Sequence, residues 1–105
     1  MSKLIIPLIA DSVVYYSAGD EEAFFSWLSR IVAVQDYKGV GRALHIETKE
    51  LPIDDESLRE FIALFTRYGV DLSQLGRFLA PENEAWFMDP QKYWHKKVFP
   101  DSFSG

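Results

Sequence analysis

A helical pattern over residues 55–68 constrains the fold of this chain more than any other feature. Its apolar positions recur at spacings of three and four and share one helical face: Leu58, Phe61, Ile62, Phe65 and Tyr68. Asp54 or Asp55 is placed to cap the start, and Gly69 stands where a left-handed C-terminal cap belongs. The pattern therefore predicts a helix over 55–68 with one buried face.

Two further helices are predicted on either side of that one. The first starts near Ser17 or Asp20, either of which can serve as N-cap, and its apolar stripe consists of Phe24, Trp27, Leu28 and Ile31. The second is shorter and is capped by Asp71. It ends before Ala80-Pro81, and its inward residues are Leu72, Leu75, Phe78 and Leu79.

Apolar, β-branched and aromatic runs predict a small sheet from residues near 4–16, 42–48 and 84–99. Residues 13–16 extend the first strand or form another after a bend, and residues 35–41 form a turn-rich link. In the last segment, Trp86-Phe87 and residues 97–99 are candidate short strands. The expected fold is α+β, with a sheet of three to four strands packed on about three helices.

The length and composition indicate one domain over residues 1–105. The hydrophobic share of 48% and the aromatic share of 15% are too high for a disordered chain, and no linker divides the sequence. The apolar run near the N-terminus is interrupted by Pro7 and ended by Asp11, which leaves it too short to span a bilayer. We expect no membrane partner.

The negative charge is concentrated in the first part of the chain. Eleven of sixteen acidic residues lie in the first sixty positions with six basic ones, while the last forty-five positions carry five of each. The net charge of −5 argues against nucleic acid as a direct ligand, because phosphate binding needs a surface rich in lysine and arginine. It suits a basic protein partner. The absence of cysteine is compatible with the reducing cytoplasm, where we expect the protein.

The sequence offers little for catalysis. His45 is predicted on the solvent side of its strand, and His95 has aromatic neighbours that can shift its titration. Residues 39–42 lead into a strand, so they form a turn and not a phosphate-binding loop. The run Asp54-Asp55-Glu56 lacks the ligand spacing of a calcium loop and is explained by capping. We expect a protein that is not an enzyme, without metal or cofactor.

The order of elements is similar to that of a known group of proteins. The similarity is carried by residues 19–28 (GDEEAFFSWL), 39–46 (GVGRALHI) and 58–75, followed by Trp86-Phe87 and Tyr93-Trp94. Over roughly residues 15–99 the chain resembles small bacterial immunity proteins of contact-dependent growth inhibition and related polymorphic toxin systems. The resemblance implies a non-catalytic inhibitor of a cognate toxin, often a nuclease and in some cases a tRNA-cleaving one. Immunity interfaces differ between toxin pairs, so no binding residue is carried over.

Charge supplies the hypothesis for the interface. A nuclease presents lysines and arginines around its active site, so an acidic surface can dock there and occlude it. The candidates are Asp20, Glu21 and Glu22 at one helix start, Asp54, Asp55 and Glu56 at another, and Glu47 on a strand, with Tyr15, Tyr16 or Tyr37 as anchors. For each acidic residue the alternative is a solvated helix cap or surface charge.

Two other functions stay open at this point. A small non-catalytic adaptor or regulatory module with a partner other than a toxin would show the same acidic composition. A minor enzyme that uses His95 together with a carboxylate is the third hypothesis.

Overall fold

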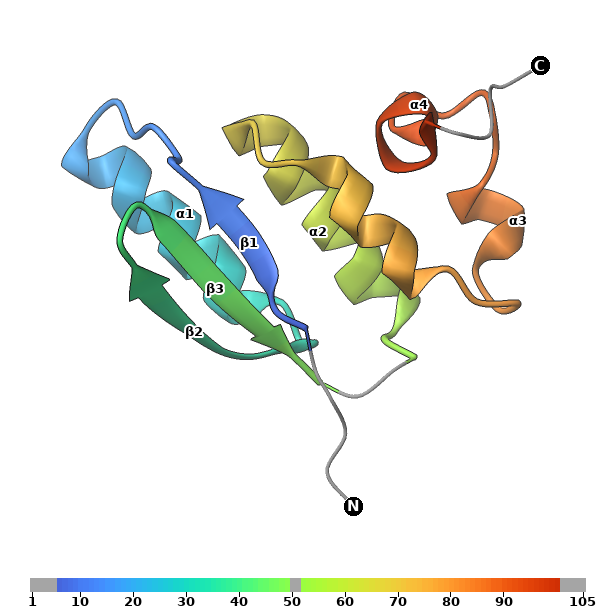
Figure 1. The fold of residues 1–105 in the computed structure, drawn as a ribbon, viewed down its shortest axis with the longest axis horizontal. Coiled ribbons are helices and arrows are strands. Elements are labelled where there is room, and N and C mark those ends of the chain that lie inside the picture. The colour runs from blue at the N-terminus through green and yellow to red at the C-terminus, as the bar shows by residue number, and fades with distance from the viewer. Residues whose placement is uncertain (1–5, 50–51, 101–105) are drawn as a thin grey trace.

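In the computed structural model, which describes residues 6–49 and 52–100, a three-stranded antiparallel sheet lies against helices (Figure 1). The strands are β1 (Leu8–Asp11), β2 (Val34–Val40) and β3 (Ala43–Thr48), in the order β1-β3-β2. The two long helices are α1 (Ala18–Arg30) and α2 (Asp55–Tyr68). The predicted α+β fold is confirmed.

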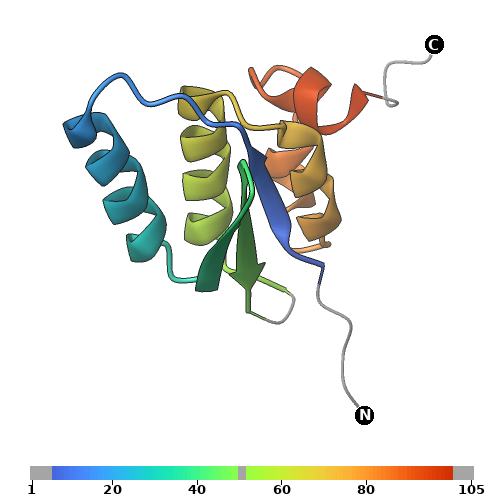
Figure 2. The same cartoon turned by 60° about the vertical axis from the view of Figure 1, so that its left-hand side comes forward.

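The sheet has one covered face and one open face. Both long helices lie on the same side of it (Figures 1 and 2), and Leu8, Ala10, Ile46 and Thr48 are buried. The opposite face carries the other residues of each strand, because side chains alternate along a strand. His45, predicted to face solvent, lies on this face but is half-buried, with Ile9 and Lys38 opposite it on the neighbouring strands.

Helix α2 forms over the predicted residues and lies at the centre of the molecule. The carboxylate of Asp54 accepts a hydrogen bond from the backbone N–H of Ser57 (3.0 Å), and Gly69 has a φ of 71°, as the predicted caps require. Figure 2 shows α2 between α1 and η1 (Leu72–Phe78), a 3₁₀ helix. Phe61 and Phe65 are fully buried, so α2 contributes two of the four largest fully buried side chains in the described part of the chain.

The segment from residue 84 to residue 99 forms short helices, and the prediction that it joins the sheet is wrong. It contains α3 (Glu84–Phe87) and α4 (His95–Val98). The indole N–H of Trp94 donates to the carbonyl of Phe87 (2.9 Å), and the rings of Phe87 and Phe99 meet edge to face at 5.0 Å. Aromatic runs of this length pack equally well in a helical turn, so their composition did not distinguish the two states.

The N-terminal half needs three corrections. Most of residues 35–41, predicted as a link, belong to β2, which pairs with β3 through the turn Gly41-Arg42 and has a bulge after Val34. Residues 13–16 are not a strand, because Ser12 has a φ of 54° and the chain leaves the sheet there. Leu72, Leu75 and Phe78 of η1 are buried as predicted. Leu79, which follows η1 and was also predicted to point inward, is 38% exposed. Residues 4–5 of the predicted first strand lie outside the described residues.

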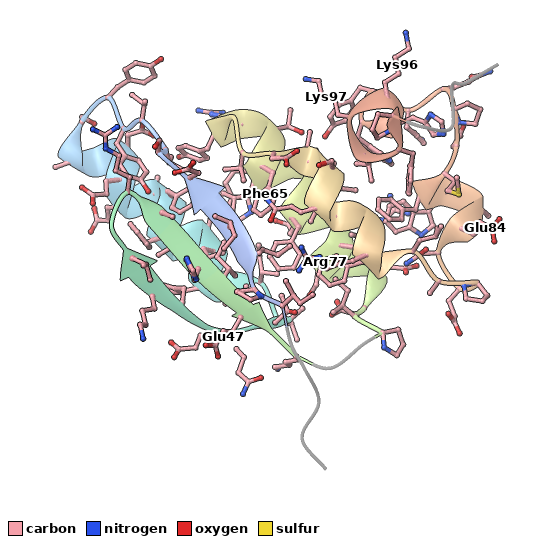
Figure 3. All side chains as sticks on the ribbon, in the orientation of Figure 1. Glu47, Phe65, Arg77, Glu84, Lys96 and Lys97 are labelled. Atoms are coloured by element: carbon pink, nitrogen blue, oxygen red, sulfur yellow. The ribbon has the colours of Figure 1, made fainter. Side chains whose placement is uncertain are left out.

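Side chains cover the outer edge of β1. The side-chain oxygen of Gln74 accepts a hydrogen bond from the backbone N–H of Ile9 (2.8 Å), and its side-chain nitrogen donates one to the Ile9 carbonyl (2.9 Å). Arg77 reaches from η1 to the carbonyl of Ile6 (2.6 Å; Figure 3). At the other edge, on β2, the carboxylate of Asp36 accepts the N–H of Tyr37 (2.8 Å). These hydrogen bonds occupy backbone N–H and C=O groups that could otherwise pair with a strand of another molecule.

Within residues 6–49 and 52–100, no helix combines the length and the apolar character that crossing a membrane requires.

Replacing Gln74 with Ala is expected to lower the free energy of unfolding by about 1–3 kcal/mol, because both backbone groups of Ile9 lose their partner. Urea denaturation of Gln74→Ala measures the loss. Gln91→Ala, which changes an exposed glutamine, is the matched control. Equal stability of the two variants would show that Gln74 does not hold the edge of β1.

Candidate functional site

The predicted acidic residues form separate clusters and not one face. Helices α1 and α2 run antiparallel (Figure 1), so their acidic starts lie at opposite ends of the helix pair. Asp20 lies beside the last turn of α2, where the hydroxyl of Tyr68 donates to Asp20 Oδ1 (3.1 Å). Helix α2 has 14 residues. At a rise of 1.5 Å per residue, about 20 Å separates the two clusters.

Asp20 fixes the loop that precedes α1. Its Oδ2 accepts the backbone N–H of Tyr16 (2.9 Å), while the hydroxyl of Ser17 accepts the N–H of Asp20 (3.1 Å) as the predicted N-cap. Tyr15 turns inward and packs on the ring of Tyr68. Burial raises the pKa of both Tyr15 and Tyr68, and nearby carboxylates raise it further. Both hydroxyls therefore stay protonated at neutral pH.

Tyr16 is the most exposed large hydrophobic side chain in the described part of the chain. It is 92% exposed, and Val14, two residues earlier, is 67% exposed. Both side chains border a pocket of 620 Å³, which is lined by Ser12, Val14, Tyr16, Asp20, Arg67, Tyr68 and Gly69. We refer to this pocket, together with the exposed Glu21 and Glu22, as the tyrosine surface.

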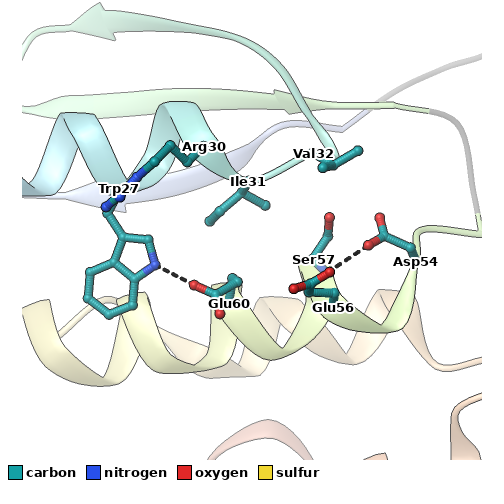
Figure 4. Close-up of a pocket in the computed structure, with 8 residues that line it drawn as sticks. All are labelled: Trp27, Arg30, Ile31, Val32, Asp54, Glu56, Ser57 and Glu60. Atoms are coloured by element: carbon teal, nitrogen blue, oxygen red, sulfur yellow. Dashed lines mark hydrogen bonds between the residues drawn. The ribbon is translucent and has the colours of Figure 1, made fainter.

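A second pocket lies at the other end of the helix pair, between the end of α1 and the start of α2 (Figure 4). It has a volume of 440 Å³ and is lined by Trp27, Arg30, Ile31, Val32, Asp54, Glu56, Ser57 and Glu60. The indole N–H of Trp27 donates to Glu60 Oε1 (2.7 Å), which fixes one wall. Three carboxylates and one guanidinium line this space, which we call the acidic pocket.

Ser57 connects the acidic pocket to the core. Its buried hydroxyl accepts the backbone N–H of Ala33 (3.0 Å), which joins the start of α2 to the segment between α1 and β2. Hydrogen bonding from the Ser57 side chain, with a smaller contribution from its backbone N–H, lowers the pKa of Asp54 below its ordinary value. Asp54 is therefore ionised at neutral pH and acts as a helix cap.

The lowered pKa of Asp54 predicts a pH-dependent contribution to stability. Its ionised form is favoured in the folded state, so the contribution is present above the unfolded value of 3.8 and is lost as the pH falls through the folded pKa. Asp54→Asn keeps a capping oxygen but removes the charge at the helix start. It should cost about 0.3–1 kcal/mol at pH 7.

Thermal or urea unfolding of the wild type and Asp54→Asn at pH 7 and at pH 2.5 tests this. The stability difference should shrink at the lower pH. A difference of the same size at both pH values would contradict an ionised cap.

Asp55 serves the packing of the C-terminal segment. Its carboxylate accepts the indole N–H of Trp86 (3.2 Å), and the guanidinium of Arg59 lies 3.9 Å from the centre of a Trp86 ring. Among the three predicted acids at this helix start, Asp54 and Asp55 thus have partners inside the molecule, while Glu56 is an exposed side chain on the acidic pocket.

Glu47 belongs to neither cluster. It is exposed and projects from β3 away from α2 (Figure 3), and Asp36 lies opposite it on β2. Tyr37, proposed as an anchor, is half-buried, with its ring against Phe25 (5.4 Å) and its hydroxyl 3.3 Å from the hydroxyl of Ser29. Tyr37 therefore supports the packing of α1 on the sheet.

The structure lends no support to His95 as a catalytic base. Its side chain is 4% exposed and lies beside the ring of Phe99 at 5.7 Å. In residues 6–49 and 52–100, no group of three or more His, Cys, Asp or Glu side chains is placed to hold a metal ion.

Sequence reasoning missed several residues that line the pockets. Trp27 carries the helical spacing of a core residue, yet its indole forms a pocket wall. Nothing in the sequence indicates that Val14 and Val32 lie at the surface, yet each is more than 60% exposed. Glu60 became a candidate only through its contact with Trp27.

Comparison with protein-family models, with curated proteins and with solved structures gives no significant match for this chain.

Proposed function

We propose that this protein is an immunity protein that binds and neutralises a cognate toxin domain with nuclease activity. Inhibition results from docking of an acidic surface on the basic region with which the toxin binds its nucleic-acid substrate. The resemblance of residues 15–99 to immunity proteins suggests this class, and the distribution of exposed charge supports it.

The observation that carries the proposal is the coincidence of exposed carboxylates, exposed apolar side chains and a pocket at the ends of the helix pair. Glu21 and Glu22 accompany Tyr16 at one end, and Glu56 accompanies Val32 at the other. Apolar side chains beside a pocket provide contact area, while a charged rim provides selectivity and a fast encounter. Such a combination fits recognition of a cationic protein.

Electrostatics explains how binding would inhibit a nuclease. The active site of a nuclease must attract phosphates, so its positive potential also attracts a protein of net charge −5. Once bound, the inhibitor occupies the space that the substrate needs and neutralises the charge that attracts it. No chemical step by the inhibitor is required.

Co-expression provides the test. Bacteria that express the toxin domain encoded directly upstream of this gene should die, and should survive when this chain is produced as well. The purified proteins should form a complex whose association rate falls by about 10-fold or more between low and physiological salt, as for electrostatically steered pairs.

Death in both cultures, with this chain present as folded protein, would rule out neutralisation of that toxin. Protection combined with a salt-independent association rate would keep the inhibitor function but contradict docking through charge.

A further inference from the structure

We infer that the tyrosine surface, and not the acidic pocket, is the face that contacts the partner, with Tyr16 as its anchor. This inference rests on the proposed function and specifies the site. The matching partner is a cationic protein surface that inserts a lysine or arginine side chain into the pocket between Tyr16 and Tyr68.

The first support is that Tyr16 is exposed although its backbone is fixed. Its backbone N–H donates a hydrogen bond to Asp20, whose carboxylate also accepts one from the hydroxyl of Tyr68. The adjacent Tyr15 packs edge to face on the ring of Phe24. A tyrosine ring 92% exposed on such a loop has only its own rotamers to lose on binding. Pre-organised tyrosines of this kind are frequent energetic centres of protein interfaces.

The second support is the local gathering of apolar surface. Val14 is 67% exposed and lines the same pocket as Tyr16. Exposed apolar side chains that gather beside a pocket on a folded protein mark interaction sites.

The third support is the charge around the pocket. Asp20 and Arg67 line the pocket, and Glu21 and Glu22 follow Asp20 on α1 as exposed side chains, so the surface is negative on balance. Two tyrosine rings and a carboxylate form a suitable environment for a cation, because ring faces and carboxylates both attract positive charge.

The acidic pocket is less suited to a partner. Its Trp27 indole is already bonded to Glu60, and its Asp54 caps α2. Val32 is the exposed large apolar side chain on its rim. The acidic pocket therefore offers less exposed apolar surface than the tyrosine surface, where both Val14 and Tyr16 are exposed.

The test measures dissociation constants for the purified toxin domain and the full chain. Tyr16→Ala should weaken binding by about thirty-fold, the size of an interface hot spot. Tyr16→Phe should stay near the wild-type value because the ring remains. Tyr93→Ala, which removes another exposed tyrosine (60%) from the C-terminal segment, is the matched control and should bind as the wild type does.

A charge comparison separates the two pockets. Glu21→Lys combined with Glu22→Lys should weaken binding and reduce its salt dependence, whereas Glu56→Lys should change both far less, because its charge lies at the other end of the helix pair. Circular dichroism and thermal unfolding establish that each variant is folded. Val14→Ser, which removes apolar contact area without adding charge, is the second variant for the same surface and should also weaken binding. It guards against a local defect caused by Tyr16→Ala.

The outcomes distinguish the inference from the proposed function. If the wild type binds the toxin and both Tyr16→Ala and Val14→Ser bind equally well, the tyrosine surface is not the interface, while the immunity function stands. If only Glu56→Lys weakens binding, the acidic pocket is the interface. If the wild type does not bind the toxin, the proposed function and this inference both fail.

Discussion

Burial of α2 is the constraint on which the rest of the structure depends. Phe61 and Phe65 are fully buried, and the ring of Phe61 stacks on that of Phe78 in η1 at 6.0 Å. A helix with an apolar face this large is stable only when other elements cover it. The sheet and α1 lie on one side of α2 and the C-terminal helices on the other, so one helix links both halves of the molecule in a single core.

Local signals in the sequence predicted this centre well. The bounds of α2 and its cap Gly69 follow from the chemistry of helix ends. For each N-cap that chemistry left two candidates, of which the structure has Asp54 and Ser17. The failures occur where local preference is weak. Residues 34–40 contain turn-forming residues and become a strand only through pairing with β3. The runs in residues 84–99 are too short for periodicity to separate a strand from a helical turn.

Only some residues of the candidate site were predictable, and their arrangement was not. Sequence indicated Tyr16 and the acids at the two helix starts, and the structure shows several of them exposed beside pockets. Their division into two clusters depends on α1 and α2 being antiparallel, which is a property of the topology and not of any local pattern. For the same reason, the partners of Asp20, Asp55 and Glu60 are residues far away in sequence.

The antiparallel helix pair has a consequence for the electrostatic potential at its two ends. Helix ends favour acids at their starts and bases in their last turns, so antiparallel neighbours bring an arginine of one helix beside the carboxylates of the other. Arg67 borders the pocket near Asp20, and Arg30 borders the one near Asp54. The guanidinium partly offsets the negative potential of the carboxylates in each pocket. Each end of the helix pair is therefore less negative than a count of its acidic residues alone indicates.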